Sequence, residues 1–161
     1  MITLYHGSNV KIEKIVLSKS HKGKDFGQGF YLSDDKNQTM KMAVCTYERE
    51  QSGAATVSSF EFDENNFVSG ELNVKTFEGY SAEWADFILM NRQNKTDNPA
   101  HDYDIVIGPI ADDQVGVQIR RLERGYITKE IFLEEIKFIH PTIQYFFGTE
   151  KAINRLNPLK P

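Results

Sequence analysis

The residues best able to do chemistry lie in two motifs near the start of the chain and one near its end. In the first, Tyr-His-Gly-Ser, a run of β-forming residues reaches His6, which Gly7 and Ser8 follow. An imidazole beside a glycine can orient a flat ligand, because no side chain shields the neighbouring backbone. A strand-end histidine beside a turn glycine, with no function, is the favoured interpretation of this motif taken alone.

The second motif, Asp-Phe-Gly-Gln-Gly-Phe-Tyr, occupies residues 25–31 and places Tyr31 close to Gly29. It lacks the third glycine of a dinucleotide-binding fingerprint and precedes a strand instead of following one. It therefore does not predict a phosphate cradle. The tyrosine ring can stack on a planar ligand, although a core role is the commoner one.

The third motif, Ile-Gln-Tyr-Phe-Phe, occupies residues 143–147. The two-residue period of a strand puts Gln144 and Phe146 on one face. A buried glutamine would need a hydrogen-bond partner. Taken alone, a solvated amide on an edge strand is the favoured interpretation.

Other polar residues are weaker candidates. Arg92 ends an expected helix, where a cation often compensates the helix dipole, but its guanidinium also suits a pyrophosphate. Asp112 follows a buried strand, where functional loops often lie, although an N-cap is its commoner role. Residues 11–14 and 19–24 form a modestly basic stretch that we expect to be solvated.

No metal site is predicted. His21, His101 and His140 show no metal-ligand spacing with one another or with Cys45.

The elements that must position these residues alternate irregularly between strands and helices. Strands are expected over residues 2–6, 29–33, 56–62, 72–77, 104–108 and 142–147. Helices are expected after the possible caps at 33–35, with Met40, Ala43, Val44 and Tyr47 as an apolar stripe, and over residues 81–92, 113–124, 128–139 and 149–156. Because no regular βαβ alternation is present, the sequence predicts an α+β fold.

Composition sets the remaining bounds. The 161 residues fit one domain over 1–161, with a tail at 157–161. The net charge of −4 argues against a protein held on nucleic acid by bulk charge. Brief contact with nucleic acid during catalysis is not excluded. A single cysteine, no visible leader and no apolar run of about 20 residues predict a cytoplasmic protein with no membrane segment.

Together the three motifs resemble the signature of ADP-ribosyltransferases of the diphtheria-toxin and poly(ADP-ribose)-polymerase-like branch, which is histidine, tyrosine, glutamate. More closely, the chain is similar to a bacterial family catalogued as a domain of unknown function. That similarity covers nearly the whole chain in order, through motifs at residues 5–8, 25–31, 83–92, 103–113 and 144–147.

The resemblance implies an ADP-ribosyltransferase-like split β-sheet core with peripheral helices, and NAD as co-substrate. It implies that His6 binds the nicotinamide-side ribose, that Tyr31 stacks on the nicotinamide and that Gln144 meets the ribose 2′-hydroxyl. The backbone of Gly7 would grip the carboxamide. Further NAD contacts would come from Ser8, Gly29, Arg92 and Asp112.

The chain departs from the signature at Gln144, which stands where the branch has glutamate. An amide oxygen can accept the ribose hydroxyl but brings no full charge to a cationic transition state. Elongation into poly(ADP-ribose) is therefore not expected. Single transfer to a macromolecular acceptor, protein or nucleic acid, is the main hypothesis. NAD hydrolysis, an inactive NAD or ADP-ribose sensor, and a purely structural interaction protein are the alternatives.

The small format also resembles bacterial toxins of toxin–antitoxin or phage-defence systems. That likeness implies a small antitoxin protein as a partner.

Overall fold

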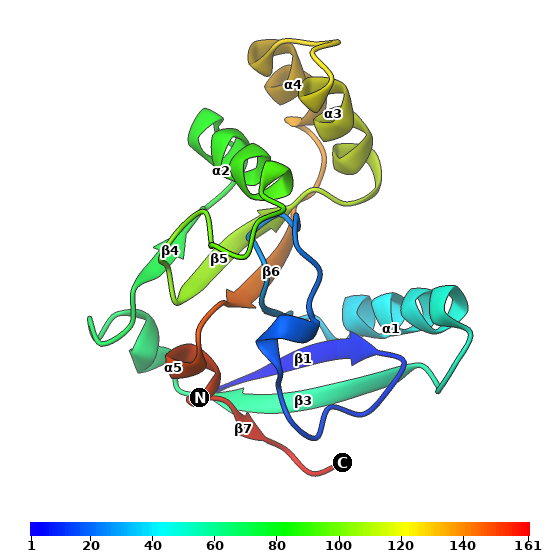
Figure 1. Ribbon diagram of the computed structural model, residues 1–161, viewed down its shortest axis with the longest axis vertical. Helices are drawn as coiled ribbons and strands as arrows, with labels where there is room; N and C mark the ends of the chain where they lie inside the picture. The colour runs from blue at the N-terminus through cyan, green and yellow to red at the C-terminus, as the bar shows by residue number, and fades with distance from the viewer.

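The computed structural model describes residues 1–161 and contains two β-sheets and five α-helices (Figure 1). The α+β class predicted from the sequence is confirmed. None of the helices is long and apolar enough to cross a membrane.

The smaller sheet has three antiparallel strands in the order β1-β3-β7. They are β1 (Ile2–Ser8), β3 (Thr56–Phe62) and β7 (Asn157–Pro158). The larger sheet has the order β2-β6-β5-β4, in which only β4 and β5 are parallel. Its strands are β2 (Phe30–Leu32), β6 (Thr142–Phe147), β5 (Ile105–Ile110) and β4 (Val74–Thr76).

The two sheets meet where β1 passes the end of β2. The Tyr5 N–H donates to the Ser33 carbonyl at 2.8 Å, and the Ser33 N–H donates to the Tyr5 carbonyl at 2.9 Å. This single bridge brings the His6 motif on β1 next to the Tyr31 motif on β2.

Five helices cover the sheets, and side-chain caps start four of them. Asp35, Ser81, Thr128 and Thr149 each accept from a backbone N–H in the first turn, as expected of N-cap residues. In Figure 1, α1 lies beside β1 and β3, whereas α2, α3 and α4 gather beyond the larger sheet. The helices are α1 (Lys36–Glu50), α2 (Ala82–Gln93), α3 (Asp113–Glu123), α4 (Lys129–Ile136) and α5 (Glu150–Ile153).

The core has two apolar clusters, and β6 contributes to both. Phe146 joins the cluster built around Trp84 and the helices α2 to α4. Its neighbour Phe147 joins the cluster that contains Leu4 and Phe60 of the smaller sheet. Since successive strand residues point to opposite faces, β6 is buried on both sides.

Several expectations about the elements are wrong in detail. The strand expected over 72–77 is limited to Val74–Thr76. The tail at 157–161 is not free, because Asn157 and Pro158 pair with Glu61 and Phe60 of β3. These short pairings depend on neighbouring strands, which local sequence does not reveal.

The apolar stripe expected on α1 is confirmed only at Ala43, which is buried. Met40, Val44 and Tyr47 are about 40% exposed, and the other buried residue of the helix is Thr39. The cause is the close approach of α1 to β1 at Gly7, where a Cβ atom would lie 2.4 Å from the Thr39 carbonyl oxygen. Small residues face that contact because larger ones do not fit it.

Gly29 is expected to be essential for the contact between β2 and β6. A Cβ at this position would lie 2.3 Å from Cε2 of Phe146 and 2.7 Å from the Phe147 carbonyl oxygen. Gly29→Ala should therefore lower the free energy of unfolding by about 1–3 kcal/mol, measured by urea denaturation. Gly79→Ala is the matched control, because its Cβ would have no neighbour within 4 Å. Equal stability of the two variants would contradict the packing argument.

Candidate functional site

A cleft of about 1050 Å³ opens where the two sheets meet, bordered by β1, β2, α1, β6 and the segment 9–24. Seven of the eight residues predicted as site residues line it, and Asp112 does not. The seven are His6, Gly7, Ser8, Gly29, Tyr31, Arg92 and Gln144. The tertiary structure thus brings all three sequence motifs to one cavity.

His6 presents a hydrogen-bond acceptor in this cleft. Its Nδ1 lies 2.7 Å from the Tyr31 carbonyl oxygen. Because a carbonyl can only accept, Nδ1 carries the proton and Nε2 keeps a lone pair. Burial lowers the pKa of His6, and the hydrogen bond to Tyr31 only partly opposes this. The imidazole is therefore neutral near pH 7, and its ring stacks on Phe30 with centroids 4.3 Å apart.

The hydroxyl of Tyr31 is held by two hydrogen bonds to the loop that precedes β2. Its hydroxyl donates to the Gly27 carbonyl at 2.6 Å and accepts from the Phe26 N–H at 3.0 Å. Burial raises the pKa of Tyr31 well above its ordinary value, so it remains a neutral phenol. The ring is consequently fixed in position and carries no charge.

A second histidine, which the sequence did not single out for this role, supports that loop. His101 Nε2 donates to the Phe26 carbonyl at 2.7 Å, and its Nδ1 accepts from the Tyr103 N–H at 3.1 Å. A chain of hydrogen bonds therefore runs from His101 through residues 26–27 and Tyr31 to His6. Only the isolated position of His101 in the polar stretch before β5 hinted at this function.

Gln144 is buried and unpartnered. Its exposed fraction is 4%, and its side-chain amide makes no hydrogen bond within the protein. The solvated edge-strand interpretation is wrong, because β6 lies between β2 and β5 in the middle of the sheet. The amide atoms of Gln144 are not among the fully buried unpaired atoms, because they retain access to the cleft, where they can bind a polar ligand.

Gly7 and Ser8 shape the rim of the cleft at the end of β1. The missing side chain of Gly7 admits α1, so this glycine has a packing role whatever binds beside it. The Ser8 hydroxyl donates to Asn9 Oδ1 at 3.3 Å and accepts from the Val10 N–H at 3.4 Å. These contacts set the direction in which the chain leaves β1.

Arg92 reaches the cleft as part of an ion-pair network. Its Nη1 donates to Asp25 at 2.8 Å and its Nε donates to Glu123 at 2.6 Å. The other Asp25 oxygen accepts from the Ala111 N–H at 2.6 Å. Burial raises the pKa of Asp25, although Ala111 and Arg92 oppose the change. The network joins the loop before β2 to α2 and to the end of β5.

Asp25 is the residue in this network that sequence reasoning missed as a functional candidate, although it opens the second motif. Asp112 does not line the cleft and occupies the N-cap position of α3. Its carbonyl accepts from the Gly116 N–H at 3.0 Å, but its side chain makes no capping hydrogen bond.

The cleft is basic, although the chain as a whole is acidic. Six cationic side chains line it against three carboxylates, which are Glu13, Asp25 and Glu50. The cations are Lys11, Lys14, Lys19, Lys24, Arg49 and Arg92. The basic stretches at residues 11–14 and 19–24 thus border the site, and the Lys24 ammonium lies 5.0 Å from the centroid of the Tyr31 ring. Such a surface favours an anionic ligand.

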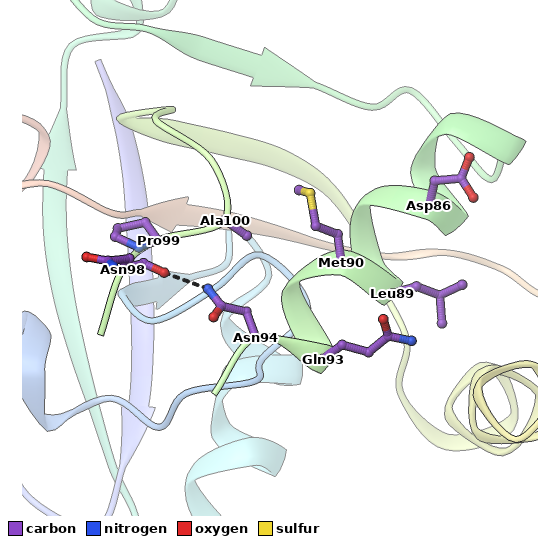
Figure 2. A pocket seen from close by; sticks show the side chains of 8 residues that line it. All are labelled: Asp86, Leu89, Met90, Gln93, Asn94, Asn98, Pro99 and Ala100. Carbon is purple, nitrogen blue, oxygen red and sulfur yellow. Dashed lines mark hydrogen bonds between the residues drawn. The ribbon is translucent and has the colours of Figure 1, made fainter. Parts of the chain in front are cut away.

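A second, shallower hollow lies at the end of α2 (Figure 2). Its lining includes Leu89, Met90 and Pro99, and Asn94 donates to the Asn98 carbonyl at 2.7 Å. Its one ionisable residue is Asp86, and it contains none of the predicted site residues. The basic cleft is therefore the better candidate for chemistry.

Comparison with known proteins agrees with the span of the sequence motifs. A family model described as "Protein of unknown function (DUF3990)" matches residues 2–157. No curated protein and no solved structure matches the chain.

Asp25→Ala should destabilise the fold, because it removes the acceptor of the Ala111 N–H and one partner of the half-buried Arg92. We expect the free energy of unfolding to fall by about 1–3 kcal/mol in urea denaturation. Asp86→Ala breaks an exposed ion pair with Lys129 instead, and should cost less than about 1 kcal/mol. Similar losses of unfolding free energy in both variants would refute the role of Asp25 in linking its loop to Arg92 and Ala111.

The two buried histidines should make stability fall with acidification. Burial lowers the pKa of both His6 and His101 in the folded state. As the pH falls below about 6.5, the ordinary pKa of histidine, the unfolded chain binds protons before the folded chain does. The contribution of the neutral histidines to the free energy of unfolding is therefore complete above that pH, and it is lost as the pH falls through their lower folded-state pKa values. Urea unfolding at pH 7.5 and 5.5 should show this loss. His101→Gln should reduce the pH dependence of the free energy of unfolding. An unchanged dependence would show that His101 does not cause it.

Proposed function

The chain belongs to the DUF3990 family, and we propose that it is an NAD-dependent mono-ADP-ribosyltransferase whose active site is the basic cleft. The observation that supports this most directly is the amide of Gln144, which makes no hydrogen bond within the protein and lines the same cavity as the Nε2 acceptor of His6. Two neutral acceptors beside a fixed aromatic ring suit the hydroxyls of a ribose and a planar nicotinamide.

The proposed fold assignment is the split-sheet core of ADP-ribosyltransferases. Its support is the pair of sheets joined at one bridge, with His6 and Tyr31 on adjoining strands and Gln144 on the central strand of the larger sheet. This arrangement agrees with the histidine, tyrosine and third-residue signature that the sequence resembles. The motifs carry the resemblance to the signature, and the shared cavity gives a physical reason for it, because all three residues can contact one ligand there.

The reaction would break the bond between ribose C1′ and the nicotinamide ring nitrogen. The bonding electron pair stays on that nitrogen, so nicotinamide leaves neutral and the ribose passes through an oxocarbenium-like transition state. A lone pair of the acceptor forms the new bond to C1′, and the acceptor releases its proton to solvent. The cleft must therefore hold the ribose firmly while charge develops at C1′.

Each site residue has a role in this step. His6 Nε2 accepts from a ribose hydroxyl, and the fixed Tyr31 ring provides a face for the nicotinamide. The Gln144 oxygen accepts from the 2′-hydroxyl, and the Gly7 backbone is assigned to the carboxamide. Because Gln144 is neutral, it orients the ribose but stabilises the cation less than a carboxylate does.

The basic lining suits the pyrophosphate of NAD, which carries two negative charges. Arg92 is engaged by Asp25 and Glu123, so we assign it to positioning the loop before Tyr31. In this proposal Ser8 and Gly29 shape the walls of the cleft, and Asp112 has no direct contact with NAD.

The proposed biological setting is a cytoplasmic toxin or defence enzyme that modifies a macromolecule and is restrained by a small antitoxin protein. This setting follows from the likeness of the small format to such toxins, and it depends on the enzymatic proposal.

A sensor that binds NAD or ADP-ribose without turnover is the second candidate, and the neutral Gln144 is the observation that favours it. Gln144→Glu separates the two. An enzyme tuned for glutamine should lose or change its activity with this substitution, whereas a sensor that lost its glutamate should gain NAD hydrolysis.

Incubation of the protein with adenylate-labelled NAD and cell extract tests the proposal. We expect label on a macromolecule, and a decrease of at least about a hundredfold with His6→Ala or Gln144→Ala, because each removes a group that holds the reacting ribose. His140→Ala is the matched control, since this exposed histidine lies outside the cleft. Thermal unfolding of each variant verifies that the fold is retained.

Other outcomes identify the alternatives. Free nicotinamide without labelled product would indicate an NAD glycohydrolase. NAD binding by calorimetry without turnover would indicate the sensor. Absence of NAD binding would refute the assignment of the cleft.

A further inference from the structure

Positive charge is concentrated in one segment of this acidic protein. Residues 9–24, here called the basic segment, contain five lysines and one glutamate, a formal charge of +4. Since the whole chain carries −4, the other 145 residues carry −8. The overall charge therefore hides a surface suited to a polyanion.

The basic segment is attached to the fold, and four of its five lysines line the cleft. The Ile12 N–H donates to the Ser58 hydroxyl at 3.1 Å, and Gln28 Nε2 donates to the Ser20 carbonyl at 2.7 Å. Ile12, Ile15 and Leu17 pack against the core cluster of the smaller sheet. All five lysines are exposed. Their charges are thus held at defined positions along the cleft.

Most of these charges lack partners in the protein. Lys22 pairs with Asp97, but Lys11, Lys14, Lys19 and Lys24 have no carboxylate within 4 Å. The hydroxyl of Ser20, which also lines the cleft, is buried and makes no hydrogen bond. Four unpaired lysines exceed what the two charges of one pyrophosphate require.

We propose that the basic segment binds the phosphodiester backbone of a single-stranded nucleic acid, and that this nucleic acid is the acceptor of ADP-ribose. The inference rests on the proposed function for its second part. Lysine ammonium groups are point charges that bind phosphate oxygens, and a groove lined by such charges follows the backbone of a single strand. The basic segment contributes five lysines within 16 residues, and four of them line the cleft.

A single strand fits the chemistry of the cleft better than a duplex. A nucleotide must leave its stack before an atom of its base can reach a buried reaction centre. In the transfer, a nitrogen or oxygen of the unpaired nucleotide bonds to ribose C1′ as the bond to the nicotinamide nitrogen breaks. The electron pair stays on nicotinamide, and the proton of the acceptor passes to solvent. A basic track beside the cleft would hold the strand for this attack.

Fluorescence anisotropy with a labelled mixed-sequence single-stranded oligonucleotide, as DNA and as RNA, measures the binding at 50 and 200 mM salt. The double variant Lys11→Gln/Lys14→Gln should bind on the order of tenfold more weakly at low salt. The slope of log affinity against log salt should become shallower by about 1.4, because two phosphate contacts are lost.

The matched control is Lys129→Gln/Lys137→Gln, which removes the same charge from α4, away from the basic segment. Its two lysines form exposed ion pairs with Asp86 and Glu134. We expect its oligonucleotide affinity to stay within about twofold of the unsubstituted protein. Equal weakening of both double variants, or no measurable binding of the oligonucleotide, would overturn the inference.

Two further readouts separate this inference from the proposed function. Label from NAD should appear on the oligonucleotide and decrease in Lys11→Gln/Lys14→Gln. Transfer to protein alone would overturn the nucleic-acid acceptor while leaving the transferase proposal intact. Lysine-dependent oligonucleotide binding without NAD binding in calorimetry would support the docking surface and refute the transferase.

Discussion

The hydrogen bonds that join β1 to β2 are the interaction on which the candidate site depends. The backbone pair between Tyr5 and Ser33 holds the two sheets together, and one residue along β1 the imidazole of His6 donates to the Tyr31 carbonyl. The same contacts bring two sequence motifs together and fix the tautomer of the histidine. Without them the cleft would have neither its shape nor its free acceptor at Nε2.

Two polar side chains at the cleft have no hydrogen-bond partner in the protein. The Gln144 amide lines the cleft without a hydrogen bond, and the Ser20 hydroxyl beside the cleft is fully buried and also unpaired. Unsatisfied buried groups are rare in folded proteins because they reduce stability, and functional sites are where they persist. The ion pair of Asp25 and Arg92 stabilises the region around the cleft, because it joins the loop before β2 to α2 and to the end of β5.

Local sequence predicted most of the secondary structure, and it failed where packing decided the outcome. The strand Thr142–Phe147 was predicted with its observed bounds, because β-branched and aromatic residues alternate there. On α1, by contrast, three of the four apolar positions are exposed and only Ala43 is buried, since Gly7 requires a small helix face against β1. Periodicity indicates that a helix has an apolar side, but it does not show which side meets a neighbour.

The sequence by itself determined the α+β class, the element types and the three motifs, because these depend on side-chain period, caps and local residue types. The tertiary structure alone decided that the motifs share one cavity, that Gln144 is buried on a central strand and that His101 supports the Tyr31 loop. It also decided that the lysines of the basic segment border that cavity. Those facts depend on contacts between residues far apart in the chain, for which a single sequence contains no local signal.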